Sequence, residues 1–341
     1  MEGTDGSGAR LLDKARVRDK ARQLLHEALK TSFDLFKIII PVSILTRMLQ
    51  QLGVVAWLGG LLGPVMRCVG LPGEMGLVWA TAMITNIYGG MVVFVSLAPG
   101  LSVTAAQASV LGAMILVAHS LPVELRIAQK AGPRFRVMVV LRVAGALVLG
   151  LILHGIYSWG GFLQMPCRIL WDPGPRDPGW GAWAAGQARM LLGIFLIILG
   201  LLLLMKLLKR LGITALLTRL LEPVLTTLGM SREAAPVTII GMTLGLSYGG
   251  GLIIQESRSG RLGKRDVFFS LALMGLCHSL IEDTLLMMAI GSHHSAVLWG
   301  RLVFALAAVL LLVKLLRRVP DETFDRYFFR AQARKGAAEP A

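Results

Sequence analysis

The sequence predicts an all-α, polytopic membrane protein built from two inverted-topology repeats of about five membrane segments each, with broken or short helices. Composition is the first observation, because the 341 residues are 55% hydrophobic and 16% charged, with a mean hydropathy of +0.68. Apolar blocks of bilayer-crossing length are typical of integral membrane proteins. The second observation is a set of motifs that recur at offsets of 159 or 160 residues. The third is that basic residues lie in short loops and tails beside the apolar spans, as the positive-inside rule requires.

Internal duplication is visible in three pairs of short motifs. Two His-Ser-Leu triplets start at residues 119 and 278, an offset of 278 − 119 = 159. The prolines of two Leu-x-Pro-Val motifs lie at residues 64 and 223, which gives 223 − 64 = 159, and two Tyr-Gly-Gly triplets start at residues 88 and 248, which gives 160. Matches in one register indicate a duplicated chain, in which corresponding segments take corresponding structures.

The chain divides by composition into five segments. We expect a cytoplasmic amphipathic segment at 1–32, a first membrane repeat at 33–158, an extracytoplasmic linker at 159–187, a second membrane repeat at 188–316 and a basic cytoplasmic tail at 317–341. Within the first segment, residues 10–30 predict a helix that lies on the anionic leaflet or, equally well, a solvated leader helix. The short apolar pieces at 54–69 and 213–228 either cross the membrane or re-enter it.

Loop charge supports the inverted arrangement. With the N-terminus inside, the basic clusters at 126–136, 206–210, 258–265 and the tail all fall on the cytoplasmic side, and the linker falls outside. Five crossings per half is an odd number, so the second half would be upside down relative to the first. Matching parts of the two halves would then meet near the midplane. We therefore expect a multi-pass protein of the cytoplasmic (inner) membrane with both termini cytoplasmic.

Two spans have polar, glycine-rich centres. Residues 75–98 and 235–255 each contain a Tyr-Gly-Gly triplet in otherwise apolar sequence. Close packing through small residues is one explanation. The other is a broken helix whose free backbone groups bind substrate. On this second reading, the substrate-binding candidates in these spans are Asn86, Tyr88, Gly89, Gly90, Tyr248, Gly249, Gly250 and Gln255.

Ionisable residues lie within the His-bearing spans. His278 and Glu282 are four residues apart and share a helix face, and Asp283 follows. Such groups are costly at membrane depth and indicate a substrate or ion site, or a buried structural network. These three are also our candidate metal ligands. Candidates from the first repeat are His119, for substrate, and Glu124, although Glu124 could instead pair with Arg126 or Arg142.

Other charged or ionisable residues have purely structural interpretations. Arg142 lies near the start of its span, where a side chain that snorkels to the headgroups is the expected explanation. Glu256 is expected to pair with Arg258 at the membrane boundary. His293 and His294 are expected to be exposed in a short outer turn.

The arrangement of Tyr-Gly-Gly on a broken helix, followed by His-Ser-Leu and acids on the next span, resembles the bacterial nucleoside recognition or Gate domain family. That group includes the spore maturation proteins A and B and is related to membrane domains of B-type ferrous-iron transporters and concentrative nucleoside transporters. The resemblance covers residues 33–316 and implies a multi-span transporter or gate. It departs from the iron transporters in having no GTP-binding Walker motif on this chain.

We therefore expect a transporter or permease that moves a small polar solute, nucleoside-like or other, through a midplane site at the repeat interface. The alternatives are a divalent metal ion permease and a non-transporting membrane assembly or signalling partner. An enzyme is not expected, because Ser120 and Ser279 each follow a histidine that points about 100° away on a helix. No cofactor or nucleic acid partner is expected. The expected partners are the lipid bilayer and a small polar solute or ion, and self-association into a homo-oligomer is left open.

Overall fold

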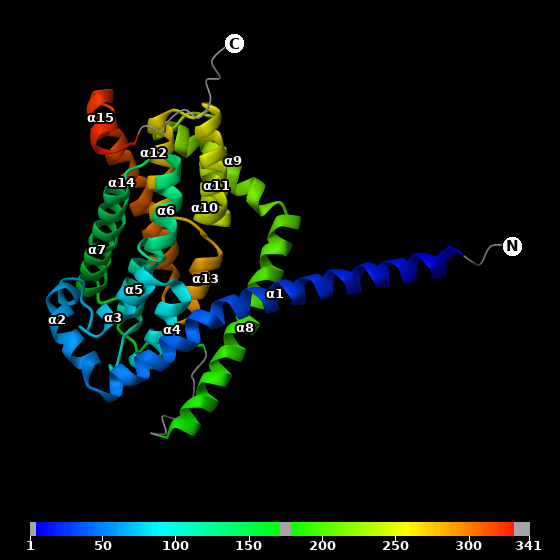
Figure 1. Cartoon of the computed structure of the whole chain (residues 1–341), viewed down its shortest axis with the longest axis vertical. Helices are drawn as coiled ribbons and strands as arrows, with labels where there is room; N and C mark the ends of the chain where they lie inside the picture. The colour runs from blue at the N-terminus through cyan, green and yellow to red at the C-terminus, as the bar shows by residue number, and fades with distance from the viewer. Residues whose placement is uncertain (1–4, 171–178, 331–341) are drawn as a thin grey trace, which may run out of the picture. The chain divides into compact units, whose positions relative to one another are not determined.

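The structure is a computed structural model that describes residues 5–170 and 179–330 (Figure 1). The middle of the predicted linker, residues 171–178, and the end of the predicted tail, residues 331–341, lie outside the described residues. The described ranges contain no β-strand, which confirms the all-α class. The first half holds α1 (Asp5–Gln51), α2 (Val54–Cys68), α3 (Met75–Ile84), α4 (Ile87–Leu97), η1 (Ala98–Gly100), α5 (Ala105–Val117), α6 (Leu121–Ala131) and α7 (Phe135–Trp159). The second half holds α8 (Trp180–Arg210), α9 (Ile213–Thr227), α10 (Ala234–Leu244), α11 (Leu246–Ser259), α12 (Lys264–Leu276), α13 (Glu282–Ala289), η2 (Ser295–Gly300), α14 (Arg301–Leu316) and α15 (Asp321–Tyr327).

Several helices are long and apolar enough to cross a membrane. Among the described residues there are four, or up to five if one bent pair counts as a single span. The four cover Ala105–Ala131, Phe135–Trp159, Trp180–Leu208 and Ser295–Leu316. The short helices α2 and α9 have 15 residues each, about 22 Å at 1.5 Å per residue, which is less than a bilayer core of about 30 Å. Five crossings per half therefore remain a prediction.

The chain forms two compact units. The described parts of residues 1–44 and 171–213 make one of them, from the first part of α1 and from α8. In this unit Lys206 pairs with Glu27 at 2.6 Å. A single helix runs through both the predicted amphipathic segment and the predicted first span, and Pro41 lies within it.

The second unit comprises residues 45–170 and 214–341, as far as they are described. At its centre are α5 and α12, in which Ala108–Val117 and Val267–Leu276 are buried without interruption. Helix α7 runs alongside α5 (Figure 1), and α14 packs on α12. All the residues of the candidate site lie in this unit.

The helix starts repeat at the offset of the sequence motifs. Helices α2, α3, α4 and α5 start at residues 54, 75, 87 and 105, and α9, α10, α11 and α12 start at 213, 234, 246 and 264, so each difference is 159. Positive φ angles repeat as well, at Gly53 and Gly212, Gly70 and Gly229, Ser120 and Ser279, and Gly132 and Gly291. Thus the duplicated sequence takes matching left-handed turns at these four pairs of positions.

Candidate functional site

Each His-bearing span breaks at its His-Ser pair. Helix α5 ends at Val117 and α12 at Leu276, and the serine after each histidine has a left-handed backbone, with φ of 48° at Ser120 and 46° at Ser279. This region is uncommon for a residue with a side chain. Residues held in sparsely populated backbone conformations gather at functional sites. The paired turns therefore point to a site at both breaks.

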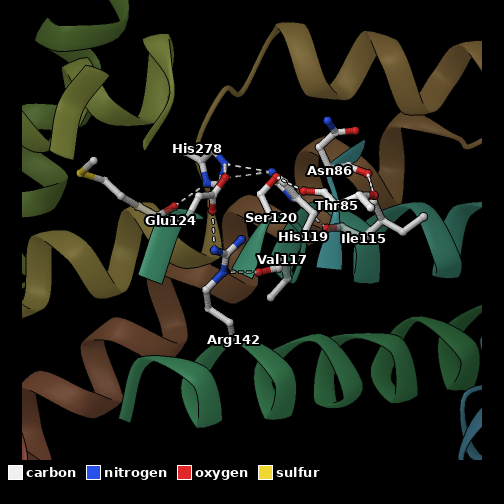
Figure 2. A network of polar contacts seen from close by, with 10 residues as sticks. Thr85, Asn86, Ile115, Val117, His119, Ser120, Glu124, Arg142 and His278 are labelled. Carbon is white, nitrogen blue, oxygen red and sulfur yellow. Dashed lines mark hydrogen bonds and ion pairs between the residues drawn. The ribbon is translucent and has the colours of Figure 1, made fainter. Parts of the chain in front are cut away.

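The two histidines meet Glu124 in a buried cluster (Figure 2). The Nε2 atoms of His119 and His278 are 3.3 Å apart, and Glu124 Oε1 lies 3.3 Å from the first and 3.4 Å from the second. The side chains are almost fully enclosed, since His119, His278 and Glu124 are 4%, 2% and 7% exposed. The cluster thus joins residues far apart in the chain, one from the second half and two from the first.

Arg142 of α7 holds the other carboxylate oxygen of Glu124. Its Nη1 donates to Glu124 Oε2, and its Nε donates to the Val117 carbonyl at 2.8 Å (Figure 2). That carbonyl is at the C-terminus of α5, where helical carbonyls lack partners within the helix. Arg142 is 1% exposed, so the predicted snorkelling is wrong. The buried guanidinium neutralises a carboxylate that would otherwise be unpaired in an apolar core.

The predicted breaks in the glycine-rich spans lie next to the His-Ser turns. Asn86 separates α3 from α4 and caps α4, because its Oδ1 accepts from Gly89 N at 2.9 Å. Ser120 Oγ donates to the Thr85 carbonyl at 3.2 Å, which ties the His119 turn to this break. In the second half Gly245, with φ of 97°, separates α10 from α11. A Cβ atom at Gly245 would lie 2.9 Å from Ser279 Oγ, so the corresponding turn is equally close.

The other predicted site residues are placed on these same elements. Asn86 and Tyr88 are half-buried on either side of the start of α4, and Gly89, Gly90, Gly249 and Gly250 are buried. Gln255 is exposed on α11. Tyr248 belongs to α11, but its side chain lies outside the described residues.

The acids of α13 do not join the cluster. Among the described residues the group able to hold a metal ion is His119, Glu124 and His278, so the ligand set differs from the predicted His278, Glu282 and Asp283. Glu282 is half-buried and Asp283 is buried at the start of α13. The reason is the turn at Ser279, which starts a new helix after His278 and removes the helical register that the spacing assumed.

Three further expectations are settled by side-chain contacts. Glu256 pairs with Arg261 at 2.7 Å, so the predicted partner Arg258 is wrong. His294 is exposed, whereas His293 is half-buried and lies 2.9 Å from Ser295 Oγ. Partial burial and the neighbouring His294 lower the pKa of His293.

Two cavities of the described chain lie away from the cluster. One of about 500 Å³ is lined by residues of α6, α7 and the C-terminal end, among them Gln129, Arg134 and Arg326. The other, of about 100 Å³, is lined by residues that include Gly70, Gln107 and Tyr157. Neither is the midplane pocket that the sequence predicts, and that pocket remains a prediction.

Comparison with known proteins places this site in a family context. Residues 32–134 match the family described as Gate, nucleoside recognition. The chain is also 28% identical over 265 residues to a protein of Bacillus subtilis (strain 168) described as the uncharacterized membrane protein YvoD, covering 77% of this chain and 84% of that protein. No solved structure matches the chain. The matched family region contains His119 and Glu124. The family match agrees with the resemblance stated from the motifs, and the description of the Bacillus subtilis protein agrees with the membrane class.

Proposed function

We propose that this membrane protein, whose residues 32–134 match the Gate nucleoside recognition family, is a transporter or permease for a small polar solute. The observation that carries the proposal is the enclosed cluster of His119, His278 and Glu124, contributed by both halves of the chain. Ionisable groups at membrane depth are costly and usually mark a solute or ion pathway. Arg142 offsets part of this cost but leaves one carboxylate oxygen and two imidazoles facing one another.

The solute site of this proposal lies at the helix breaks. Half-helix ends at membrane depth offer free backbone groups and partial charges to a ligand. Glycine lets a ligand approach the backbone closely. The residues proposed to meet the solute are those predicted from the sequence: Asn86, Tyr88, Gly89, Gly90, His119, Tyr248, Gly249, Gly250, Gln255, His278, Glu282 and Asp283.

The proposal includes an inverted topology in the bacterial inner membrane. Support comes from the helix starts that repeat at an offset of 159 and from basic loops that share one side if each half crosses five times. In an inverted repeat the matching breaks meet at the midplane and alternate access follows from rocking one half against the other. Both termini would then be cytoplasmic, and the linker 159–187 would be outside.

The first test is a ligand screen followed by uptake. Purified protein is screened for thermal shift with nucleosides and organic anions, and each compound that binds is then measured for uptake into proteoliposomes. We expect Glu282→Gln to fold like the parent and to lose most uptake, because the amide keeps the side-chain shape but removes a half-buried charge next to the cluster-bearing turn.

The matched control is Glu233→Gln, which removes the charge of an exposed residue before α10 and should leave uptake unchanged. If Glu282→Gln transports like the parent at every pH, Glu282 is not part of the solute site. Binding of a compound without uptake of any compound would favour the non-transporting assembly or signalling partner and contradict the transporter.

A further inference from the structure

The tautomer of both histidines is fixed by the backbone. His119 Nδ1 lies 2.9 Å from the Ile115 carbonyl, and His278 Nδ1 lies 2.7 Å from the Met274 carbonyl. A carbonyl oxygen only accepts hydrogen bonds, so each Nδ1 must carry the proton and donate it. In the neutral rings the Nε2 atoms are then bare, and their lone pairs point at each other and at Glu124 Oε1.

Three lone pairs that converge in a buried space repel one another unless a positive species lies between them. The three separations are 3.3, 3.3 and 3.4 Å. A proton on one Nε2 would give charge-assisted hydrogen bonds, which are normally about 2.7–2.9 Å long. In a tetrahedral site with zinc bonds of about 2.0–2.1 Å, by contrast, neighbouring ligand atoms are about 3.3–3.4 Å apart. The observed separations match the edges of such a tetrahedron.

We propose that His119 Nε2, His278 Nε2 and Glu124 Oε1 bind one divalent transition-metal ion of the zinc class. Two imidazoles and one carboxylate suit ions such as Zn²⁺, Co²⁺ and Fe²⁺, and they do not suit Mg²⁺ or Ca²⁺, which prefer all-oxygen sites. Three protein ligands leave the fourth tetrahedral position open, as in metal sites that bind water or a substrate.

The surroundings of the ligands support this assignment independently. Histidines that bind metal usually donate their second ring nitrogen to a carbonyl or carboxylate, and both histidines do so here, to Ile115 and Met274. Carboxylate ligands are in turn hydrogen-bonded, and Arg142 holds Glu124 Oε2 so that Oε1 remains for the ion. The ligands are thus oriented before an ion arrives.

The two halves contribute unequal numbers of ligands to the ion. His119 and Glu124 come from the first half and His278 alone comes from the second, because both acids of α13 lie outside the ligand set. Asp283 is buried and its Oδ2 has no hydrogen-bond partner among the described residues. The inference deepens the proposed function by naming the class of ion held at its site, and binding of that ion can be tested without any transport.

The test uses purified full-length protein, stripped with a chelator and titrated with Zn²⁺ and Co²⁺. We expect one ion per chain, the intense visible bands of four-coordinate Co²⁺, and X-ray absorption of the Zn²⁺ form that shows two imidazoles with bonds of about 2.0–2.1 Å. His119→Gln and His278→Gln should each weaken affinity at least about 100-fold, beyond the usual effect of losing an outer-shell partner. His293→Gln, in the other pair of neighbouring histidines, is the matched control and should bind like the parent.

Absence of stoichiometric binding to folded parent protein, a spectrum without imidazole ligands, or unchanged affinity in both cluster variants would overturn the inference. The absorption measurement uses the parent alone, so it decides the question even if a variant fails to fold. Solute uptake is measured independently, so a failure of metal binding would contradict this inference without contradicting the transporter. Parent protein that binds one ion but takes up none of the compounds would instead count against the transporter.

Discussion

In the first half of the chain Glu124 and Arg142 form an ion pair, whereas in the second half Asp283 and Arg301 occupy the matching positions without forming one. Both offsets are 159, since 283 − 124 and 301 − 142 give the same difference. Arg301 is fully buried, and its Nε and Nη1 atoms have no hydrogen-bond partner among the described residues. Its Nη2 reaches Thr284 Oγ1 at 3.5 Å.

Two local differences account for the contrast. Asp283 is one methylene shorter than Glu124, and α13 starts at Glu282, whereas α6 starts at Leu121, which corresponds to Leu280. The helix that carries Asp283 therefore starts two residues later, relative to the shared turn, than the helix that carries Glu124. The lesson is that duplication preserved the backbone and the arginines but not the charge network. The first half has an ion pair between Glu124 and Arg142, whereas in the second half Asp283 and Arg301 are both buried without an ion pair between them.

The largest change in the free energy of unfolding should come from replacing one of the two arginines, and each variant is the control for the other. Arg142→Met leaves the Glu124 carboxylate buried beside two imidazoles without its cation, and breaking a buried pair in this way costs about 3–5 kcal/mol. Arg301→Met removes a buried cation that forms no ion pair among the described residues, so we expect a smaller loss than for Arg142→Met. Denaturant titration in mixed micelles measures the free energy of unfolding of both variants. Equal losses in the two variants would mean that the halves do not differ.

A second difference between the halves concerns how closely the broken helices pack. A Cβ atom at Gly249 would lie 2.2 Å from the Gly241 Cα, whereas at Gly90, the matching residue, it would lie 2.7 Å from the Ala82 Cβ. Gly249→Ala should therefore cost about 1–3 kcal/mol through overpacking, and Gly90→Ala should cost less. The apparent melting temperature in detergent gives the ranking.

Gly251→Ala is the control for this pair of variants, because a Cβ atom there has nothing within 4 Å. It should keep or raise the melting temperature, since alanine is favoured over glycine in a helix by about 1 kcal/mol. A drop at Gly251 equal to that at Gly249 would indicate a general intolerance of α11 and would remove the packing explanation.

The smallest effect should come from restoring the missing methylene. Asp283→Glu gives the second half the acid of the first half, and we expect it to pair with Arg301 and to raise stability by about 1 kcal/mol. Glu124→Asp is the reverse change and should lower stability. The same denaturant titration measures both. A lower stability for Asp283→Glu would show that the later start of α13, rather than side-chain length, separates the acid from Arg301.

Much of the fold could be predicted from the sequence, because hydropathy is a local signal and because the repeated motifs can be recognised directly along the chain. They gave the all-α membrane class and the breaks near Asn86 and Gly245. The side-chain network was less accessible. Pairing of Glu124 with Arg142 was one of the alternatives that the sequence offered, and it is confirmed, but the burial of Arg142 and its bond to the Val117 carbonyl were not predicted because they depend on contacts between helices. One signal was present and unused: Arg142 and Arg301 are themselves separated by 159.

The spacing of His278, Glu282 and Asp283 misled for a related reason. Residues four apart share a face only if the helix continues, and the positive φ of Ser279 ends that continuity. Serine has no strong preference for a left-handed backbone that a sequence pattern would reveal. The repeated His-Ser pair was the clue, but its backbone conformation is visible only in the structure.

The two histidines face each other through the same ring nitrogen, Nε2, and this bears on whether the two halves hold an ion equally. An ion between His119 Nε2 and His278 Nε2 would be bound by chemically identical ligands from the two halves, so the imidazoles alone could not favour one exit over the other. Glu124 belongs to one half only and is fixed there by Arg142. A single carboxylate would thus make the surroundings of the ion differ between the two halves, although the two imidazoles are equivalent.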